Sequence, residues 1–480
     1  MVDKIIKLYW FRYHWFRKKI EKYQYNKKVH NKSKYLNFFS GNIQFDIVVP
    51  LYETPKDYFF EMVESVLHQS YQNWRLILID ASTKNYLIDE VANHYSYEPR
   101  IEYYKLEKNL GISGNTNVAF TKVTGDYCVL LDHDDFLALN ALESIHDVLK
   151  DKTAIDLVYT DEDKYDDQDD FYFDPYYKSA PDIYKLRNNN YICHMLVLSK
   201  DLLKRVVGER SQYDGAQDHD FILRCFENAR TIRHVPGILY HWRVHEKSTS
   251  AHPESKYYAY EAGVKAITDH LTRSQITAKV IQNSYPGFYQ VFYQGAVLHD
   301  VAVLLHSVAD ISTIDLTDYK FGISKEKIFL MDKYGHIVNY ATYNTVDFTE
   351  LRVEHLIIVN QQYSISEDTC INNLIGICGQ DRIAVTSGKV VGKFGVVQSF
   401  GTIRKHHYLE VLPFGQNIIT QETAYINLDL CCIKMTVVKD YNFLFNAIRK
   451  NMKIIKKDEV IDDLQLIALY EPTCIAYFKT

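Results

Sequence analysis

Three aspartates follow an apolar stretch in the sequence YCVLLDHDDFLALN at residues 127–140. Asp132, Asp134 and Asp135 lie so close together that their carboxylates repel one another unless a cation sits between them. Hard divalent cations prefer oxygen ligands, and magnesium or manganese also takes phosphate oxygens as further ligands. The cluster therefore predicts a Mn²⁺ or Mg²⁺ site that suits a phosphorylated substrate. The alternative is a helix-capping turn that carries spare charge.

Two further interpretations of acidic stretches compete with this one. The sequence YTDED at residues 159–163 also follows an apolar run, and its acids continue to Asp170, which is typical of a solvated loop. Phosphatases with an aspartyl nucleophile also begin with a strand followed by two aspartates. In those enzymes Gly-Thr usually follows and the strand is the first of the fold. Here Phe136 and Leu137 follow, after three earlier strand patterns, so the phosphatase interpretation is disfavoured.

The elements that must position these carboxylates alternate between strand and helix patterns. Strands are expected at residues 45–52, 74–81, 100–106 and 127–132, and helices follow the first and the last of them. Asn140, with Glu143 three residues later, predicts the start of the last helix. This alternation predicts an α/β fold with a mostly parallel sheet that is covered on both faces. Ligands of such sheets collect at the carboxyl ends of the strands. Asp80, Asp132 and the loop at 50–53 are therefore expected to face one crevice.

Composition limits the class of protein. The length of 480 residues predicts two or three domains, and the net charge of −6 argues against nucleic-acid binding over the whole surface. A transmembrane helix needs about 18 consecutive apolar residues, which the sequence lacks, and no secretory signal is expected. The eight cysteines are scattered without a CxxC pair. This pattern predicts reduced thiols in a cytoplasmic protein instead of a disulfide framework or a zinc site.

Residues 1–44 form a basic segment in which aromatic residues are interleaved with Lys and Arg. Its acidic residues are Asp3 and Glu21 alone. A basic helix with aromatic residues suits the surface of an anionic membrane, which predicts a peripheral position at the inner face of the cell membrane. A solvated helix that packs on its own domain is the alternative.

From about residue 45 to 285 the chain resembles the family 2 glycosyltransferases with the GT-A fold. The resemblance is carried by six stretches in the order of the family: VVPLYE, LILIDAS, NLGISGNTN, GDYCVLLDHDD, YDGAQDHDFILRC and LYHWRVHEKSTSA. The chain looks most like the enzymes that build bacterial surface polysaccharides, including rhamnosyltransferases. The resemblance implies a Rossmann-like domain at residues 45–290 that binds a nucleotide sugar.

The resemblance also implies roles for individual residues. Asp134 matches a metal ligand, Asp132 matches a position near the donor ribose or the waters of the metal, and His245 matches a histidine that completes the metal site in some relatives. Position 116 often carries Arg in relatives but is Thr116 here, which removes one expected phosphate contact. The positions implied to bind the donor are Pro50, Tyr52, Glu53, Asp80, Asn109, Gly111, Asn117, Asp132 and Arg243.

The stretch GAQDHDFILR matches the segment of the family that carries the catalytic base, and Asp218 falls on that base. An acceptor hydroxyl is a poor nucleophile, and a carboxylate that takes its proton contributes about 10²–10⁴-fold to the rate. Gln217 replaces the commoner Glu, and Gln217 and Trp242 are implied on the acceptor side. Without the resemblance, Asp218 and Asp220 would be interpreted as charges that complement a helix dipole.

The expected function is inverting transfer of a hexosyl or rhamnosyl group from a nucleotide sugar to a growing surface glycan. The acceptor is expected to be lipid-linked, at the cytoplasmic face of the membrane. The alternative from another class of protein is a non-catalytic scaffold or acceptor-binding partner in a polysaccharide-assembly complex.

Residues 295–480 are expected to form a second α/β domain. The stretch HLIIVNQQYSISEDTC, at residues 355–370, can be aligned with the acidic strand end, which places Asn360, Gln362 and Tyr363 at the positions of Asp132, Asp134 and Asp135. This alignment suggests a degenerate GT-A-like module that has lost its metal ligands. An unrelated α/β domain is the alternative.

Overall fold

The computed structural model describes residues 38–150, 154–244, 257–283 and 286–294, and a discontinuous set between 301 and 478. Residues 1–37, which hold most of the predicted basic segment, lie outside the described residues. The chain divides into a first unit of residues 1–183 and 190–270 and a second unit of residues 184–189 and 271–480. No helix in the described part of the chain is long and apolar enough to cross a membrane.

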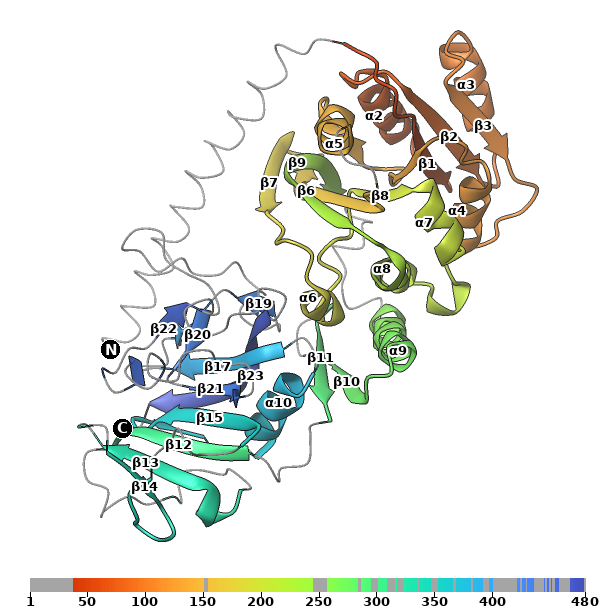
Figure 1. The fold of residues 1–480 in the computed structure, drawn as a ribbon. Helices are drawn as coiled ribbons and strands as arrows, with labels where there is room; N and C mark the ends of the chain where they lie inside the picture. Colours follow the sequence, from red (N-terminus) through yellow and green to blue (C-terminus); the bar gives the residue numbers. More distant parts are fainter. Residues whose placement is uncertain are drawn as a thin grey trace, which may run out of the picture. The chain divides into compact units, whose positions relative to one another are not determined.

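The first unit is built on a mixed, mostly parallel sheet (Figure 1). Its strands are β1 (Phe45–Leu51), β2 (Trp74–Asp80), β3 (Ile101–Lys105), β4 (Tyr127–Leu130), β5 (Phe136–Leu137), β6 (Leu157–Asp166), β7 (Phe171–Tyr176), β8 (Leu196–Ser199) and β9 (Ile232–Val244). They lie in the order β3-β2-β1-β4-β8-β6-β9-β5, and β7 pairs with β6. The strands β1 to β4, β6 and β9 run in one direction, and β5, β7 and β8 run against them. The predicted α/β class with a mostly parallel sheet is therefore confirmed.

Helices cover both faces of this sheet because strand side chains alternate in direction. The helices are α2 (Lys56–Leu67), α3 (Tyr86–Tyr95), α4 (Ile112–Thr121), α5 (Ala141–Leu149), α7 (Lys200–Val206), α8 (Gln217–Asn228) and α9 (Tyr257–Arg273). Ile47 and Val49 of β1 share a buried core with Phe59 of α2 and Ile145 of α5. Val48, which points the opposite way, is also buried, and α4 packs against β1 and β2.

The parallel pairings bring the predicted strand ends together. Leu51 at the end of β1 pairs with Asp80 at the end of β2, and Val48 pairs with Leu130 at the end of β4. Asp132 follows β4 directly after Leu131. As expected for parallel strands, the carboxyl ends that carry these acids are adjacent at one edge of the sheet.

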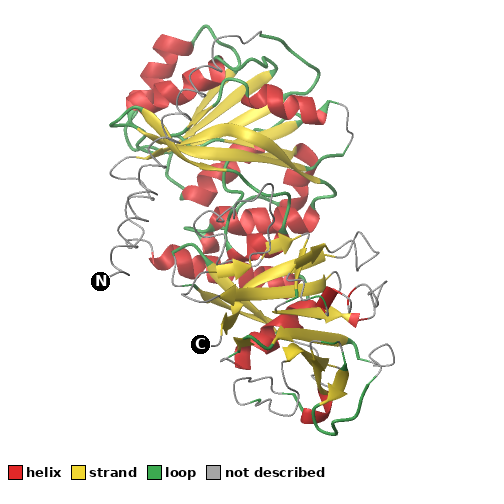
Figure 2. Ribbon diagram, turned by 90° about the vertical axis from the view of Figure 1, so that its left-hand side faces the viewer, coloured by secondary structure: helices red, strands yellow, loops and turns green. Residues whose placement is uncertain are grey.

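The second unit holds a larger mixed sheet (Figure 2). Its strands are β12 (Val301–Val308), β13 (Ile328–Asp332), β14 (Ile337–Asn339), β15 (His355–Asn360), β16 (Tyr363–Ser364), β17 (Ile383–Val391), β18 (Val397–Ser399), β19 (Gln421–Thr423), β21 (Leu430–Lys434) and β23 (Ile467–Phe478). The unit also holds the short helix α6 (Ile183–Asn188), the helix α10 (Asp368–Cys378), the hairpin of β10 (Ala278–Gln282) and β11 (Tyr289–Tyr293), and the pair β20 (Tyr425–Asn427) and β22 (Ile454–Lys456). Apolar side chains on both faces of the main sheet form two buried clusters. The boundary predicted near residue 290 falls inside this unit.

Seven strands of each main sheet share the same order and directions, whereas the next strand differs, because β14 is antiparallel to β13 and β3 is parallel to β2. The order β2-β1-β4-β8-β6-β9-β5 of the first unit corresponds to β13-β12-β15-β21-β17-β23-β16 of the second. Each pair of neighbours has the same relative direction in both units. In addition, β18 lies on β17 as β7 lies on β6, and α10 follows β16 as α5 follows β5. This agreement supports the hypothesis that the second unit repeats the fold of the first.

The turn that carries the aspartates differs between the units. Residues 131–135 separate β4 from β5, whereas Gln361 and Gln362 alone separate β15 from β16. Tyr363 therefore begins β16 as Phe136 begins β5, and the predicted alignment of Tyr363 with Asp135 is wrong. The shorter turn of the second unit carries amides in place of carboxylates.

Candidate active site at the acidic turn

The acidic turn between β4 and β5 is held by strand β9. The Tyr240 hydroxyl donates a hydrogen bond to Asp135 Oδ2 at 2.6 Å and accepts one from the Asp132 backbone N–H at 3.3 Å. The Arg243 backbone N–H donates to Asp135 Oδ1 at 2.8 Å, and Arg243 Nε donates to the Asp134 carbonyl at 2.7 Å. Burial raises the pKa of Asp135 well above its ordinary value. Asp135 is thus a buried carboxyl group that supports the turn from within.

Arg243 fixes the acidic turn to two other elements. Its side chain is fully buried, and its guanidinium pairs with Glu61 of α2 and with Asp167 of the turn between β6 and β7. The same group lies over the ring of Tyr58, 4.5 Å from the ring centroid. These contacts are those of a residue that holds the turn in place. The phosphate contact implied for Arg243 stays a prediction.

Asp132, Asp135 and His194 are the described residues whose ligand atoms converge, with all of these atoms within 4.8 Å of one another. The Asp132 side chain is 55% exposed, whereas both oxygens of Asp135 already accept hydrogen bonds. Of this group, the exposed Asp132 offers the carboxylate oxygen that a hard divalent cation prefers. Asp134 is not part of this group, and His245 lies outside the described residues.

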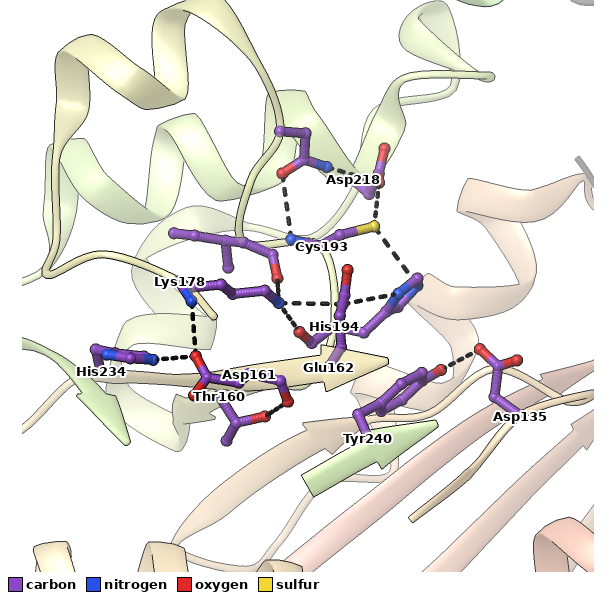
Figure 3. A network of polar contacts seen from close by, with 12 residues as sticks. Asp135, Thr160, Asp161, Glu162, Lys178, Cys193, His194, Asp218, His234 and Tyr240 are labelled. Atoms are coloured by element: carbon purple, nitrogen blue, oxygen red, sulfur yellow. Dashed lines mark hydrogen bonds and ion pairs between the residues drawn. The ribbon is translucent and has the colours of Figure 1, made fainter. Parts of the chain in front are cut away.

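His194 lies between the carboxylates of Asp132 and Glu162, and Figure 3 shows it beside Glu162. Its Nε2 is 3.3 Å from Asp132 Oδ2, and its Nδ1 is 3.6 Å from Glu162 Oε2. The imidazole stacks on the Tyr240 ring, with the centroids 4.7 Å apart and the planes at 7°. Burial disfavours the protonated form, yet the contacts with Cys193, Asp132 and Glu162 raise the pKa of His194 well above its ordinary value. No motif in the sequence singles out this histidine, which lies in a largely apolar stretch.

The sequence YTDED forms the buried part of β6, so its interpretation as a solvated loop is wrong. Strand β9 pairs with β6 from Leu157 to Asp166, and the other edge of β6 pairs with β8 at residues 157–159 and with β7 from Glu162 onward. Buried carboxylates need compensating partners. Each of the three acids contacts a basic side chain. Asp161 lies 2.6 Å from His234, Glu162 lies 3.0 Å from Lys178, and Asp163 lies 2.6 Å from His241.

Asp218 lies in the first turn of α8 and is half-buried. Its Oδ2 accepts a hydrogen bond from Asn190 Nδ2 at 2.8 Å and lies 3.7 Å from Cys193 Sγ. Asp220, two residues on, is fully buried and pairs with Arg224 at 2.8 Å. Asp220 is therefore held in an ion pair within the fold, whereas Asp218 lies at the polar network of the site.

The predicted donor loops are held by hydrogen bonds of their own. Glu53 Oε1 accepts from the backbone N–H and the hydroxyl of Thr83 at 2.8 and 2.7 Å, which lowers the pKa of Glu53. Asp80 is buried and accepts from the Ser82 N–H at 2.8 Å and from Lys105 Nζ at 3.1 Å. The carboxylates thus shape the loops at the ends of β1 and β2.

The stretch NLGISGNTN, at residues 109–117, includes the first half of α4 and contacts the segment before α8. Asn109 Oδ1 accepts a hydrogen bond from the Gly111 N–H at 2.9 Å. Gly111 has a φ of 80°, a backbone conformation that residues with a side chain rarely adopt. Asn117 exchanges two hydrogen bonds with the backbone of Glu209, at 2.8 and 2.7 Å. The Thr116 hydroxyl donates to a carbonyl of its own helix at 2.9 Å and does not replace the missing Arg.

The other predicted residues lie at the same end of the sheet or in the acidic network. Pro50 is part of β1, and Tyr52 is 46% exposed in the loop that follows. Gln217 Oε1 accepts from the Gly215 N–H at 2.8 Å. The Trp242 ring lies 5.6 Å from the His194 ring. Their roles toward donor and acceptor stay predictions.

Glu209 is a further carboxyl group that the sequence does not single out. It is 8% exposed, and burial together with the charges of Asp218 and Asp132 raises the pKa of Glu209 to about 8. Its backbone is the partner of Asn117. The group therefore remains largely protonated at neutral pH, close to the charges of the site.

Part of the chain matches one protein family, and several known proteins are similar to it. The model of the family described as Glycosyl transferase family 2 matches residues 46–207. The chain is 36% identical over 234 residues to the uncharacterized protein y4gI of Sinorhizobium fredii, covering 48% of this chain and 25% of that protein. It is 26% identical over 388 residues to the O-antigen biosynthesis protein RfbC of Myxococcus xanthus, covering 74% of this chain and 30% of that protein.

The chain is also similar to a chondroitin synthase and to a solved structure of S. aureus TarS. The chain is 26% identical over 204 residues to the chondroitin synthase of Escherichia coli, covering 42% of this chain and 29% of that enzyme. A crystal structure of S. aureus TarS 1–349 in complex with UDP-GlcNAc superposes with a TM-score of 0.39 at 19% identity, covering 48% of this chain and 66% of that one. The aligned regions span only 25% and 30% of the first two relatives named.

Proposed function

We propose that this chain, which belongs to glycosyl transferase family 2 through its domain at residues 46–207, transfers a sugar from a nucleotide-sugar donor to a growing surface polysaccharide. The similarity to proteins named for O-antigen biosynthesis and chondroitin synthesis supports a role in polysaccharide assembly. The hexosyl or rhamnosyl donor, the lipid-linked acceptor and a position at the inner face of the membrane are parts of the same proposal.

One observation carries the proposal. The acidic turn and the half-buried Asp218 belong to one polar network, in which His194 contacts Asp132 and Cys193, and Cys193 contacts Asp218. A transferase of this kind needs a negatively charged site for a metal-bound diphosphate and a separate carboxylate for the acceptor hydroxyl. In this proposal Asp132 belongs to the first of these and Asp218 is the second, and His194 and Cys193 connect the two aspartates.

Asp132 and Asp134 are the residues that would hold a Mn²⁺ or Mg²⁺ ion. Such an ion would stabilise the negative charge that develops on the diphosphate as the sugar leaves. Asp135 is unsuited to this role, because its two oxygens already serve Tyr240 and Arg243. The side chain of Asp132 is exposed, and its Oδ2 faces His194.

The proposed reaction is a single in-line displacement assisted by Asp218. The acceptor oxygen attacks the anomeric carbon, and its bond to that carbon forms while the bond from the carbon to the diphosphate oxygen breaks. The electron pair of the broken bond leaves with the nucleoside diphosphate, and the hydroxyl proton passes to the Asp218 carboxylate. The configuration at the anomeric carbon is inverted, and no covalent intermediate with the protein forms.

The second unit is proposed to be a module of the same fold without a donor site. The shared topology supports a common fold, and the two-residue turn of amides removes the carboxylates that a metal–diphosphate site prefers. In this proposal the second unit supports acceptor binding or assembly, and residues 1–44 contact an anionic membrane.

The experiment that tests the proposed function is a turnover assay with a panel of UDP-glucose, UDP-N-acetylglucosamine, GDP-mannose and dTDP-rhamnose. Each donor is incubated with Mn²⁺ and with lipid-linked mono- and disaccharides, and the product linkage is determined by NMR. We expect one donor to be consumed with inversion, and Asp218→Asn to lower the rate at least tenfold while donor affinity is unchanged. Transfer with retention, or full activity of Asp218→Asn, would contradict the proposal.

A further inference from the structure

The irregular segment 190–194 contacts both ends of the proposed site. It connects α6 to β8 without regular secondary structure. Its first residue contacts Asp218, and its last residue contacts Asp132. Figure 3 shows Cys193 and His194 of this segment between Asp218 and Glu162.

Asn190 fixes the orientation of the proposed base. Its Nδ2 donates to Asp218 Oδ2 at 2.8 Å, and its Oδ1 accepts from the Cys193 N–H at 3.4 Å. Because an amide donates only from its nitrogen and accepts only at its oxygen, these two partners determine how the side chain is turned. The hydrogen bond from Asn190 therefore fixes the direction of one oxygen of the Asp218 carboxylate.

His194 fixes the carboxylate on the donor side. Its Nε2 faces Asp132 Oδ2 at 3.3 Å, and its Nδ1 faces Glu162 Oε2 at 3.6 Å. Stacking on Tyr240 defines the plane of the imidazole, and Tyr240 in turn bonds to the acidic turn. The ring therefore cannot rotate without losing contacts on both edges and on its face.

Lys178 anchors the segment between these two residues. Its ammonium donates to the carbonyls of Ile192, at 2.5 Å, and His194, and it pairs with Glu162 at 3.0 Å. The Lys178 side chain has 0% exposure, so these acceptors take the place of water around the charge. A buried ammonium with two backbone acceptors on one segment holds that segment in a single conformation.

We propose that segment 190–194 is a positioning element that sets Asp218 and Asp132 in a fixed relation, with Asn190 acting on the base and His194 on the donor-side carboxylate. This inference rests on the proposed function, which supplies the roles of the two aspartates. A displacement of about 1 Å at reacting groups can cost about 10²-fold in rate, so an element that spans both groups affects turnover directly.

The first test is Asn190→Ala, with Asn189→Ala as the matched control. Asn189 carries the same amide one residue earlier, but its Nδ2 donates to the Gly287 carbonyl at 3.0 Å. With the donor and acceptor that the panel identifies, Asn190→Ala is expected to lower kcat about 10- to 100-fold, leaving the donor KM and the Tm unchanged. Asn189→Ala is expected to keep the wild-type kcat. A wild-type kcat for Asn190→Ala, or an equal loss in both variants, would overturn the inference.

The second test is His194→Ala, which should have the opposite kinetic signature. Because His194 acts on the donor side, this variant is expected to raise the donor KM and to weaken Mn²⁺ binding about tenfold, with a smaller effect on kcat at saturating donor and metal. A loss confined to kcat would contradict the assignment of His194 to the donor side.

The third test asks whether Asn190 acts through Asp218. In Asp218→Glu the carboxyl group is displaced from the Asn190 amide, so adding Asn190→Ala should cost no further activity. An equal factor in both backgrounds would show an independent role and overturn the inference. The outcomes for Asp218→Asn and Asn190→Ala distinguish a failure of the proposed function from a failure of the positioning element. Full activity of Asp218→Asn refutes the proposed base, whereas an inactive Asp218→Asn beside a fully active Asn190→Ala refutes only the positioning element.

Discussion

At the scale of single residues, the carboxylates of the acidic turn differ because their partners differ. Asp135 is enclosed by Tyr240 and Arg243, and burial raises its pKa. The side chain of Asp132 is exposed. Desolvation acts to raise the pKa of Asp132, but the hydrogen bond with His194 and its charge outweigh this effect and lower it. Asp135 thus supports the turn from its buried side, whereas Asp132 lies on its exposed side.

The first prediction concerns Asp134, the metal ligand implied by the resemblance. Asp134→Asn removes one anionic oxygen, so Mn²⁺ affinity and turnover should fall at least tenfold while the Tm without metal stays at the wild-type value. Metal binding is measured by calorimetry and folding by thermal unfolding. Asp169→Asn, an exposed change outside the acidic turn, is the control. Full activity in excess chelator would show that the metal assignment is wrong.

The second prediction concerns the pH dependence of stability at Glu209. The pKa of Glu209 is raised from 4.5 to about 8 in the folded chain. The folded state therefore binds this proton more tightly than the unfolded state, and the associated stability falls as the pH rises from about 4.5 to about 8. Glu209→Gln stays neutral, so its Tm should fall less over this interval than the Tm of the wild type. Glu261→Gln, at an exposed position of α9, should follow the wild type, and an unchanged slope for Glu209→Gln would contradict the assignment.

At the scale of elements, the acidic turn depends on strand β9 and helix α2. Arg243 donates from β9 to the Asp134 carbonyl and pairs with Glu61 on α2 and with Asp167. A planar guanidinium can serve three acceptors in fixed directions, whereas a lysine ammonium is a point charge on a flexible stem. The position of the turn is therefore set by a residue that lies 109 positions after Asp134 in the sequence.

The third prediction is that Arg243→Lys loosens the acidic turn. The variant should lower the Tm by a few degrees and weaken Mn²⁺ binding about 10- to 100-fold, as expected when a support of metal ligands is lost. Arg233→Lys is the matched control, because Arg233 lies on the same strand and is exposed. Wild-type metal affinity in Arg243→Lys would show that the turn holds its shape without this clamp.

The sequence predicts the framework of the first unit but not its polar interior. The strands β1, β2, β3 and β4 begin and end within two residues of their expected limits. Helix α5 follows Asn140 as predicted, although the Asn140 side chain donates to the Ser144 hydroxyl and accepts no hydrogen bond from the first N–H groups of the helix. Local patterns carry this information.

The buried acids of β6 and the role of His194 could not be predicted in the same way. An acidic run is typical of solvent exposure unless basic partners meet it, and those partners come from distant positions such as His234 and Lys178. Asn190 and Cys193 likewise reach Asp218 only through the tertiary fold. Signals of this kind depend on long-range pairing, which one sequence without its fold does not contain.

At the scale of the whole molecule, two units that share the order and directions of seven strands differ in the turn between two of them. The strand β15 ends in the buried Asn360, whose Oδ1 accepts from the Gln362 N–H at 3.0 Å. In the first unit the corresponding turn is three residues longer and carries the aspartates. The proposal that only the first unit holds a donor site rests on this difference between the two turns.

The fourth prediction is that the full chain binds one nucleoside diphosphate with Mn²⁺. Neutral amides do not supply the anionic oxygens that a metal–diphosphate site prefers, so calorimetric titration with UDP, GDP and dTDP should give one site per chain. Asp134→Asn should abolish that site, and Gln362→Ala should leave both binding and transfer unchanged. Two sites per chain, or a site that survives Asp134→Asn and disappears in Gln362→Ala, would place donor binding in the second unit. Since Gln361 and Gln362 form the whole connection between β15 and β16, no acidic residue of that turn could supply the ligands in their place.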